Sequence, residues 1–145
     1  MGTNAGIMRQ QVTIGNAALL TLPTPANFIE LVPAPGIGKI LVLIAAVFDF
    51  KPVAAYTGVD ASFEAKIYNG DQFNPAAFSF EDNFIKSAVD VIEVANNSGY
   101  FDSYGSAASW DNVPLILAGN NVADFTGGDP GNELIVTVLY EIVTR

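Results

Sequence analysis

The sequence predicts an all-β fold, an antiparallel β-sandwich or jelly roll of about seven or eight strands with one short helical turn. Two observations favour this fold class. Short apolar or alternating segments recur along the chain and are separated by Gly, Pro and Asn, and no long segment has the period of a helix. The length of 145 residues is that of one ordinary domain. We therefore expect a single β-sandwich domain over residues 1–145, with an extended N-terminal arm over about residues 1–10.

The first candidate strand is residues 11–14, and the second is residues 28–32, which alternate around Glu30. The chain then reads LVPAPGIGKILVLIAAVF over residues 31–48. Proline holds the start of this stretch extended and glycine permits the turn that follows. The apolar run from residue 40 to residue 48 is therefore expected to be a third strand that begins after a Pro-Gly turn.

Two other interpretations of this stretch fail. A phosphate-binding loop needs glycine five positions before its Gly-Lys pair and Ser or Thr after it, but position 33 is Pro33 and Lys39 is followed by Ile40. A membrane helix needs about twenty apolar residues, and the uninterrupted run has nine. The run is typical of a strand buried on both faces, at the centre of a sandwich or in a sheet whose outer face a neighbouring subunit covers.

The remaining segments follow the same logic. Residues 63–68 alternate, so Glu64 and Lys66 are expected on one side of a strand. The spacing in residues 83–97 is ambiguous, and it favours a short helical turn over 82–87 followed by a strand over 89–94. Residues 96–112 are rich in Gly, Ser and Asn and indicate a long surface loop. The last two strands are expected at residues 115–117 and 133–143.

Charge and composition exclude several classes of partner. The chain has 6 basic and 15 acidic residues, a net charge of −9, and its few cations are scattered. Binding to nucleic acid or to an anionic membrane surface is therefore not expected. The N-terminal residues lack the pattern of a secretory signal. Half of the chain is apolar and only 14% is charged, which favours an oligomer or an assembly in which apolar surface faces another chain.

Enzyme chemistry has few candidates in this chain. Histidine and cysteine are absent, so only carboxylate chemistry of the glycosidase type is left. Its candidate residues are Glu64, Asp102, Asp111 and Asp124. Sequence alone does not bring any two of them together, and solvated carboxylates that keep an apolar chain soluble are the favoured interpretation. We therefore expect no enzyme, no catalytic residue and no cofactor.

A calcium loop is the weaker possibility for the segment NNVADFTGGDPGNE. Its candidate ligands are Asp124, Asp129, Asn132 and Glu133, whose oxygen atoms suit Ca²⁺. The spacing is not that of an EF-hand, and turn formation explains the Gly, Asp and Pro residues without a metal. No metal site is therefore expected here.

Aromatic residues gather in two places and give a candidate interaction surface. It consists of Phe73, Phe78, Phe80, Tyr100, Tyr104 and Trp110. Ordinary packing against the sandwich, a protein contact and a sugar-binding platform all remain open for these side chains. In the last case, a carbohydrate-binding module of a tail or fibre, Tyr100, Tyr104 and Trp110 would stack on sugar rings while Asp102 and Asp111 bind hydroxyl groups.

Four segments together carry a family resemblance. In chain order they read LVPAPGIGKILVL, AAYTGV, IYNGD and PLILAGNNVADFTGGDPGNELIVTVLYEIV. Over residues 22–143 the chain resembles a group of small tailed-phage virion proteins, most strongly at 32–43, 55–58 and 120–140. The matching residues belong to turns and strands, and none is a catalytic signature. Residues 73–111 have no counterpart in the pattern.

The resemblance implies a structural subunit of the phage particle with a β-sandwich or jelly-roll fold. Such proteins are commonly trimeric, and they include capsid decoration (cement) proteins and the bases of head fibres. The implied partners are further copies of the chain in a homotrimer and the major capsid protein. The implied location is the outer surface of the head, after synthesis in the host cytoplasm.

Overall fold

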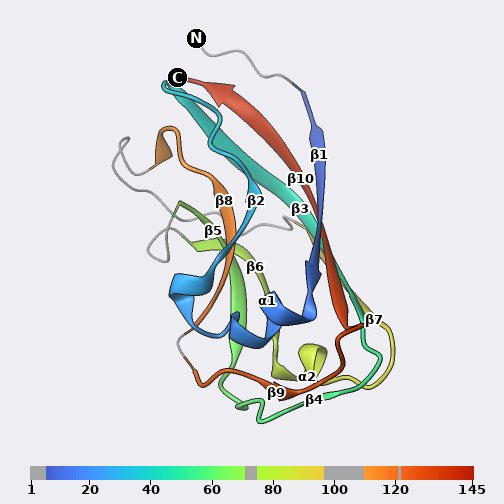
Figure 1. The fold of residues 1–145 in the computed structure, drawn as a ribbon. Helices are drawn as coiled ribbons and strands as arrows, with labels where there is room; N and C mark the ends of the chain where they lie inside the picture. Colours follow the sequence, from blue (N-terminus) through green and yellow to red (C-terminus); the bar gives the residue numbers. More distant parts are fainter. Residues whose placement is uncertain (1–5, 71–74, 97–109, 121) are drawn as a thin grey trace.

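Two four-stranded antiparallel sheets pack face to face around a shared core (Figure 1). The computed structural model describes residues 6–70, 75–96, 110–120 and 122–145. The long sheet has the order β1 (Met8–Gly15), β10 (Glu133–Thr144), β3 (Lys39–Lys51) and β7 (Val91–Asn96). The short sheet has the order β2 (Ile29–Val32), β8 (Leu115–Gly119), β5 (Glu64–Asn69) and β6 (Pro75–Glu81). The predicted fold class, an antiparallel β-sandwich, is confirmed.

Smaller elements close one end of the sandwich. β4 (Tyr56–Thr57) and β9 (Thr126–Gly127) form a two-stranded ribbon that crosses below both sheets in Figure 1. The helical elements are α1 (Asn16–Thr21), the 3₁₀ turn η1 (Pro25–Asn27) and α2 (Asp82–Ile85). The helical turn expected over residues 82–87 is thus present as α2, whereas α1 and η1 were not predicted, since six- and three-residue elements are too short to show a period.

Most strand predictions are confirmed, with differences at their ends. β10 and β5 lie within one residue of the expected bounds, β3 continues to Lys51, and β7 begins two residues later than residue 89. β6 was not predicted, because its sequence PAAFSFE was interpreted only as part of an aromatic cluster. β1 begins at Met8, so the last residues of the expected N-terminal arm are paired with β10, and residues 1–5 lie outside the described residues.

The β3–β10 pair is the centre of the long sheet. Its register runs from Glu133 opposite Lys51 to Thr144 opposite Lys39, with a bulge where Leu139 and Tyr140 pair with Ala45 and Leu43. Ile44 is the extra residue, and it shifts the alternation of buried and half-buried positions by one. On the core side of β3 every position is buried, but on the other side every interior position is only half-buried. The expected burial on both faces is therefore wrong within the single chain.

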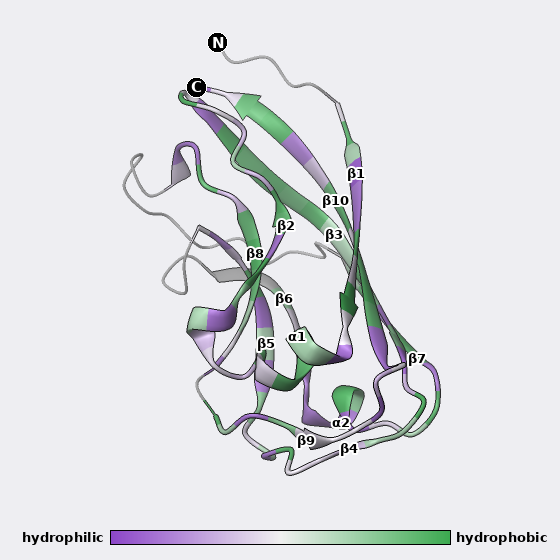
Figure 2. Cartoon of the chain, viewed as in Figure 1, coloured by the Kyte–Doolittle hydropathy of each residue, from purple (hydrophilic) through white to green (hydrophobic). Residues whose placement is uncertain are grey.

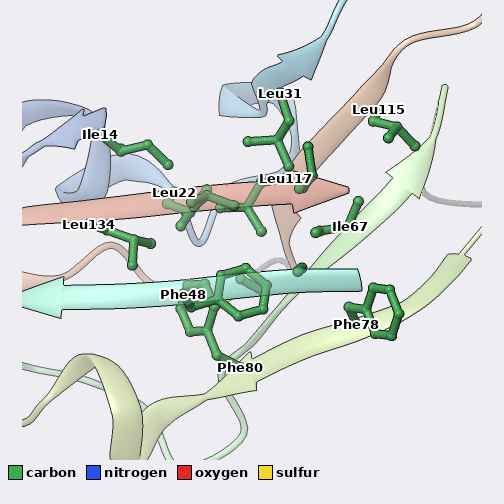
Figure 3. Close-up of a cluster of buried hydrophobic side chains, with 14 of the residues drawn as sticks. Ile14, Leu22, Leu31, Phe48, Ile67, Phe78, Phe80, Leu115, Leu117 and Leu134 are labelled. Atoms are coloured by element: carbon green, nitrogen blue, oxygen red, sulfur yellow. The ribbon is translucent and has the colours of Figure 1, made fainter. Parts of the chain in front are cut away.

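Aromatic rings fill the middle of the core. Phe48 of β3 and Phe80 of β6 meet edge to face with ring centroids 5.1 Å apart, which joins the two sheets (Figure 3). Phe63 continues this contact to Phe125 near β9, at 4.7 Å. Close packing extends to the backbone at Gly119, where a Cβ atom would lie 2.5 Å from the carbonyl oxygen of Leu22. Only glycine fits where β8 passes the segment after α1.

The Pro-Gly turn before β3 is held by the chain that precedes β8. Gly36 and Gly38 have φ angles of +104° and +77°, which glycine adopts without strain. The backbone N–H of Gly38 donates to Asp111 Oδ1 at 2.7 Å, and that of Gly36 donates to Asn112 Oδ1 at 2.8 Å. The backbone N–H of Asn112 in turn donates to the carbonyl oxygen of Lys39 at 2.9 Å. The turn that resembled a phosphate loop is therefore a structural connection between the two sheets.

Candidate interaction surface

An aliphatic surface lies on the outer side of the long sheet. Side chains alternate along a strand, so the residues between the buried positions of β3 and β10 point away from the core. Hydrophobic residues follow one another along most of β3 (Figure 2). We call this surface the aliphatic face, and its members are Val42, Ile44, Val47, Ile92, Val94, Ile135 and Leu139.

Strand pairing brings these side chains together across three strands. Val47 of β3 is paired with Val94 of β7 on one side and with Thr137 of β10 on the other. The residues of β3 and β10 are half-buried by their neighbours, whereas Ile92 and Val94 are each 65% exposed. A polar solvent-facing side is the usual arrangement in an antiparallel sheet. This sheet instead presents aliphatic side chains from three adjacent strands.

Polar side chains border the aliphatic face along β1. Arg9, Gln11 and Thr13 occupy the outward positions of this strand, and Arg9 Nη2 donates to Gln11 Oε1 at 2.7 Å. The charged residues at outward positions of the long sheet are Arg9, Asp49, Lys51, Glu133 and Glu141. Two basic and three acidic groups give this side a net charge of −1, compared with −9 for the whole chain. The aliphatic face is therefore close to neutral on a strongly acidic chain.

The aliphatic face also carries a shallow hollow. Its volume is about 340 Å³, and it is lined by Arg9, Ala45, Ala46, Val47, Thr137 and Leu139. The small outward side chain of Ala45 lies opposite the larger Leu139 of β10. A hollow of this kind accepts an apolar side chain that protrudes from another surface. The aliphatic face is therefore apolar and also has a hollow into which a side chain of another molecule can pack.

The carboxylates considered for catalysis are held apart by different partners. Glu64 Oε2 lies 3.2 Å from Lys66 Nζ on the same side of β5, as the alternation predicted. Asp111 accepts the Gly38 N–H and its Oδ2 lies 3.8 Å from Arg145 Nη1. Asp124 accepts from Thr24 Oγ1 at 3.1 Å, and Asp102 lies outside the described residues. These three carboxylates make structural contacts, and none of these contacts brings two of the three together.

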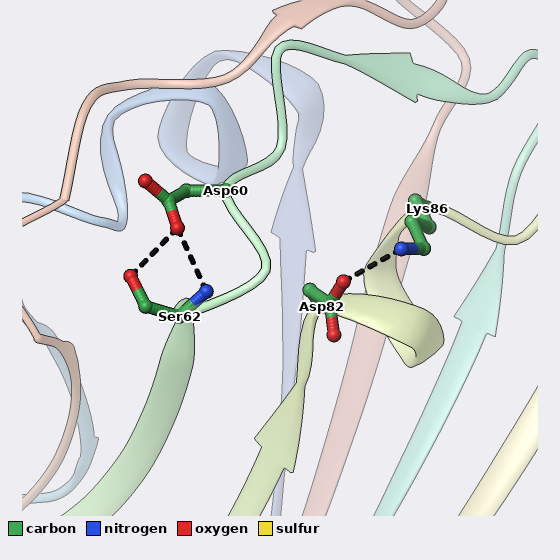
Figure 4. A network of polar contacts seen from close by, with 4 residues as sticks. All are labelled: Asp60, Ser62, Asp82 and Lys86. Atoms are coloured by element: carbon green, nitrogen blue, oxygen red, sulfur yellow. Dashed lines mark hydrogen bonds and ion pairs between the residues drawn. The ribbon is translucent and has the colours of Figure 1, made fainter.

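Two further carboxylates show the same local use (Figure 4). Asp60 accepts hydrogen bonds from the hydroxyl and the backbone N–H of Ser62, both at 2.7 Å, and these lower the pKa of Asp60. The Lys86 ammonium donates to Asp82 Oδ2 at 2.6 Å, and this hydrogen bond lowers the pKa of Asp82. Both groups stay ionised at neutral pH and stabilise a turn and α2, respectively.

The side chains of two calcium candidates, Asp129 and Asn132, accept hydrogen bonds from the backbone. Asn132 is 1% exposed, and its Oδ1 accepts from the backbone N–H groups of Val53 at 2.6 Å and Ala54 at 3.1 Å. Asp129 Oδ1 accepts from the Gly131 N–H within its own turn at 2.8 Å. Within the ranges that the structure describes, no group of three or more acidic residues could hold a metal ion. Hydrogen bonding to the backbone accounts for Asp129 and Asn132.

The aromatic interaction surface predicted from the sequence needs correction. Phe78 and Phe80 are 3% and 0% exposed and belong to the core, because β6 directs them between the two sheets. Neither can contact a partner while β6 is folded. Trp110 is half-buried at the start of the chain that leads to β8. Phe73, Tyr100 and Tyr104 lie outside the described residues.

The sugar-binding hypothesis loses one of its polar groups. Asp111, expected to bind hydroxyl groups, already accepts a hydrogen bond from the Gly38 N–H and lies near Arg145.

Sequence reasoning did not single out the aliphatic residues of β7. The signal that could have identified them is their alternation with Glu93, together with the continuous apolar run of β3. The described part of the chain also contains no helix long and apolar enough to cross a membrane.

No family model and no curated protein sequence matches the chain. Among solved structures it is similar to one titled "Cyanophage Pam1 capsid asymmetric unit", with a TM-score of 0.46 and 12% sequence identity. The match covers 97% of this chain and 85% of that chain. A likeness at this level of identity and TM-score assigns neither a family nor a function.

Proposed function

We propose that the chain is a non-enzymatic structural protein of a tailed-phage virion, a capsid decoration (cement) protein. In this proposal it forms a homotrimer, binds the major capsid protein on the outer surface of the head, and stabilises the shell. The observation that carries the proposal is the aliphatic face, a near-neutral apolar surface over three strands of one sheet. An exposed apolar surface of this kind marks a site of contact with another molecule, which in this proposal is a protein.

Two further observations support this role. The carboxylates of Glu64, Asp111 and Asp129 take part in an ion pair, a backbone contact and a turn, which suits a rigid scaffold better than an active site. The sequence resemblance to small phage virion proteins comes from turn and strand segments, and these form β3, β8 and β10 in the fold. A scaffold that resists deformation is what a protein that joins capsid subunits requires.

The strand order supports a jelly roll as the finer description of the sandwich. Without the short β4 and β9, the strands counted in chain order give sheets of order 1-8-3-6 and 2-7-4-5. Each sheet thus takes strands from both ends of the chain, as two interleaved Greek keys do. The jelly roll is also the fold that the sequence resemblance implies.

The experiment that tests the proposal is cryo-electron microscopy of the virion that contains this chain, combined with deletion of its coding sequence. We expect density for the sandwich on the outside of the head, and we expect heads without the protein to release DNA at a lower temperature. Re-addition of the purified protein should restore the release temperature. Density on the tail alone, or heads of unchanged heat stability, would contradict the proposal.

A further inference from the structure

The aliphatic face differs from the rest of the surface in charge and in hydropathy, and both differences bear on what covers it. We propose that a neighbouring copy of this chain covers the aliphatic face, so that this face is the self-association interface of the proposed homotrimer. This inference rests on the proposed function, because it names the contact by which the proposed oligomer forms. It concerns the residues Val47, Ile92, Val94, Ile135 and Leu139 in particular.

The timing of assembly favours a second copy as the occupant. A decoration protein is made before it meets a capsid, and Ile92 and Val94 would remain two-thirds exposed beside the apolar side chains of β3 for that time. Further copies of the chain are present from synthesis onward and can cover the face at once. Interfaces of permanent homo-oligomers resemble a divided core, whereas contacts formed later are more polar. The aliphatic face has the first kind of composition.

The aliphatic face supplies a large part of the area that such a contact needs. From Ile40 to Asp49, β3 is roughly 34 Å long at about 3.4 Å per residue, and three strands spaced about 4.8 Å apart are roughly 14 Å wide. The product is at most roughly 490 Å², because β7 is shorter than β3, and it is more than half of the approximately 800 Å² that each partner contributes to an interface of standard size. The hollow beside Leu139 adds a place for a protruding side chain.

The charge distribution allows two like chains to meet there and disfavours other contacts between them. Each chain has a net charge of −9, so most of its surfaces repel a second copy. The outward side of the long sheet has a net charge of −1, and its charges lie around the aliphatic residues, at Arg9, Lys51 and Glu133 among others. Contact through this side therefore brings few like charges together. The outward side of the long sheet thus combines a low net charge with aliphatic side chains.

The experiment compares lysine substitutions on and off the face. Val94→Lys and Ile92→Lys introduce an ammonium group on the face, and Val53→Lys introduces the same group in the loop between β3 and β4. The control is matched, because Val53 and Val94 are both 65% exposed. Sedimentation velocity should show an oligomer for the native chain and for Val53→Lys. For Val94→Lys and Ile92→Lys we expect association at least about a hundredfold weaker, with unchanged circular dichroism and thermal unfolding of the monomer.

A second measurement does not depend on disrupting the oligomer. The chain has no cysteine, so Val94→Cys and Val53→Cys each provide a single thiol. In the oligomer the thiol at position 94 should react with a maleimide at least about tenfold more slowly than the thiol at position 53, because burial excludes the reagent. A monomeric native chain, an oligomer that persists in Val94→Lys and Ile92→Lys, or equal labelling rates would each overturn the inference.

These outcomes are separate from failure of the proposed function. An oligomer that dissociates on Val94→Lys while the protein is absent from phage heads would support the inference and contradict the decoration role. If the protein is found on heads but its thiols at positions 94 and 53 react at equal rates, the decoration role would be supported and the inference would be overturned.

Discussion

The outer sides of the two sheets differ in composition although both sheets share one core. The short sheet presents Glu30, Glu64, Lys66, Ser79 and Glu81 at its outward positions, with a small buried cluster of Tyr68, Ile116 and Ala118 between them. The long sheet presents the aliphatic face. Outside this buried cluster the short sheet follows the usual pattern of a solvated sheet, and the long sheet departs from it on the same kind of scaffold.

This difference separates the residues that form the core of the chain from those that we propose to form its interface. The inner side of the long sheet, with Leu43, Phe48 and Phe50, already supplies the apolar area that the sandwich needs. The aliphatic residues on its outer side add little to the core of one chain. Selection for folding alone would allow polar residues there, as on the short sheet. The contact with another copy of the chain that we propose would account for their presence.

The largest expected effect comes from the core that both sheets share. Phe48→Ala removes a fully buried ring that contacts Phe80 and Phe84 across the sandwich. We expect the free energy of unfolding to fall by about 3–5 kcal/mol, because the cavity lies between both sheets. Urea unfolding of the monomeric Val94→Lys background measures it. A matched Phe28→Ala change at a 51% exposed site should cost much less, and equal losses would refute the assigned core.

The next effect comes from making the short sheet resemble the long one. Glu64→Val with Lys66→Ile joins the outer side of β5 to the apolar cluster that contains Tyr68. Burial of the two new side chains should strengthen association by about 2–3 kcal/mol and produce complexes larger than the native oligomer. Light scattering measures their mass. Glu64→Gln with Lys66→Gln is the control that removes both charges without adding apolar area. Larger complexes in that control would show that loss of charge, and not apolar burial, causes the effect.

A smaller effect is expected at a buried hydrogen bond between the sheets. Asn69 of β5 is 2% exposed, and its Nδ2 donates to the carbonyl oxygen of Leu41 in β3 at 2.9 Å. Asn69→Ala should lower the free energy of unfolding by about 1–2 kcal/mol, because a buried carbonyl loses its donor. Asn120→Ala removes a similar bond to Ser62, of 2.6 Å, at an exposed site. Chemical denaturation should show a near-zero change for the control, and comparable losses would contradict the argument.

The smallest effect depends on pH and concerns Glu93 at the edge of the long sheet. Desolvation, and then the carboxylate of Glu81 on the short sheet, raises the pKa of Glu93 above its ordinary 4.5. The stability that protonation provides is therefore complete below pH 4.5 and is lost as the pH rises through the raised pKa.

Glu93→Gln should consequently be more stable than the native chain at pH 7, by less than about 0.5 kcal/mol since the group is exposed. The difference should disappear below pH 4. Thermal unfolding from pH 3 to pH 8 measures it, with Glu30→Gln on the other sheet as control. A difference in stability between Glu93→Gln and the native chain that grows as the pH falls would contradict the prediction.

The long sheet was largely predictable from the sequence because its signals are local. The period of two in β10 and the apolar run of β3 each define a strand without reference to distant residues. The short strands β4 and β9 were not predictable, because two residues have no period and they pair over a separation of about seventy positions. Long-range pairing also decides the role of Asn132, whose partners Val53 and Ala54 come from another part of the chain.

The candidate surface was predictable only in part. Composition and the run of residues 40–48 indicated that a sheet could be covered by a neighbouring subunit. The aromatic residues were misassigned at Phe78 and Phe80, because their alternation in PAAFSFE was outweighed by their clustering. Which side of a strand faces the core depends on the strands that pack against it, and that information is not local.

Glu93 has a consequence for how copies of the chain avoid uncontrolled growth. Among the described strands β7 pairs only with β3, so within the described residues its other backbone edge, next to the aliphatic face, has no strand partner. Glu93 lies at the middle of that edge and on the core side of the strand, opposite Phe48. A strand that extended the sheet there would have to desolvate this carboxylate further. The charge of Glu93 therefore disfavours pairing of a further strand at this edge, and it leaves the proposed contact through the aliphatic face unaffected.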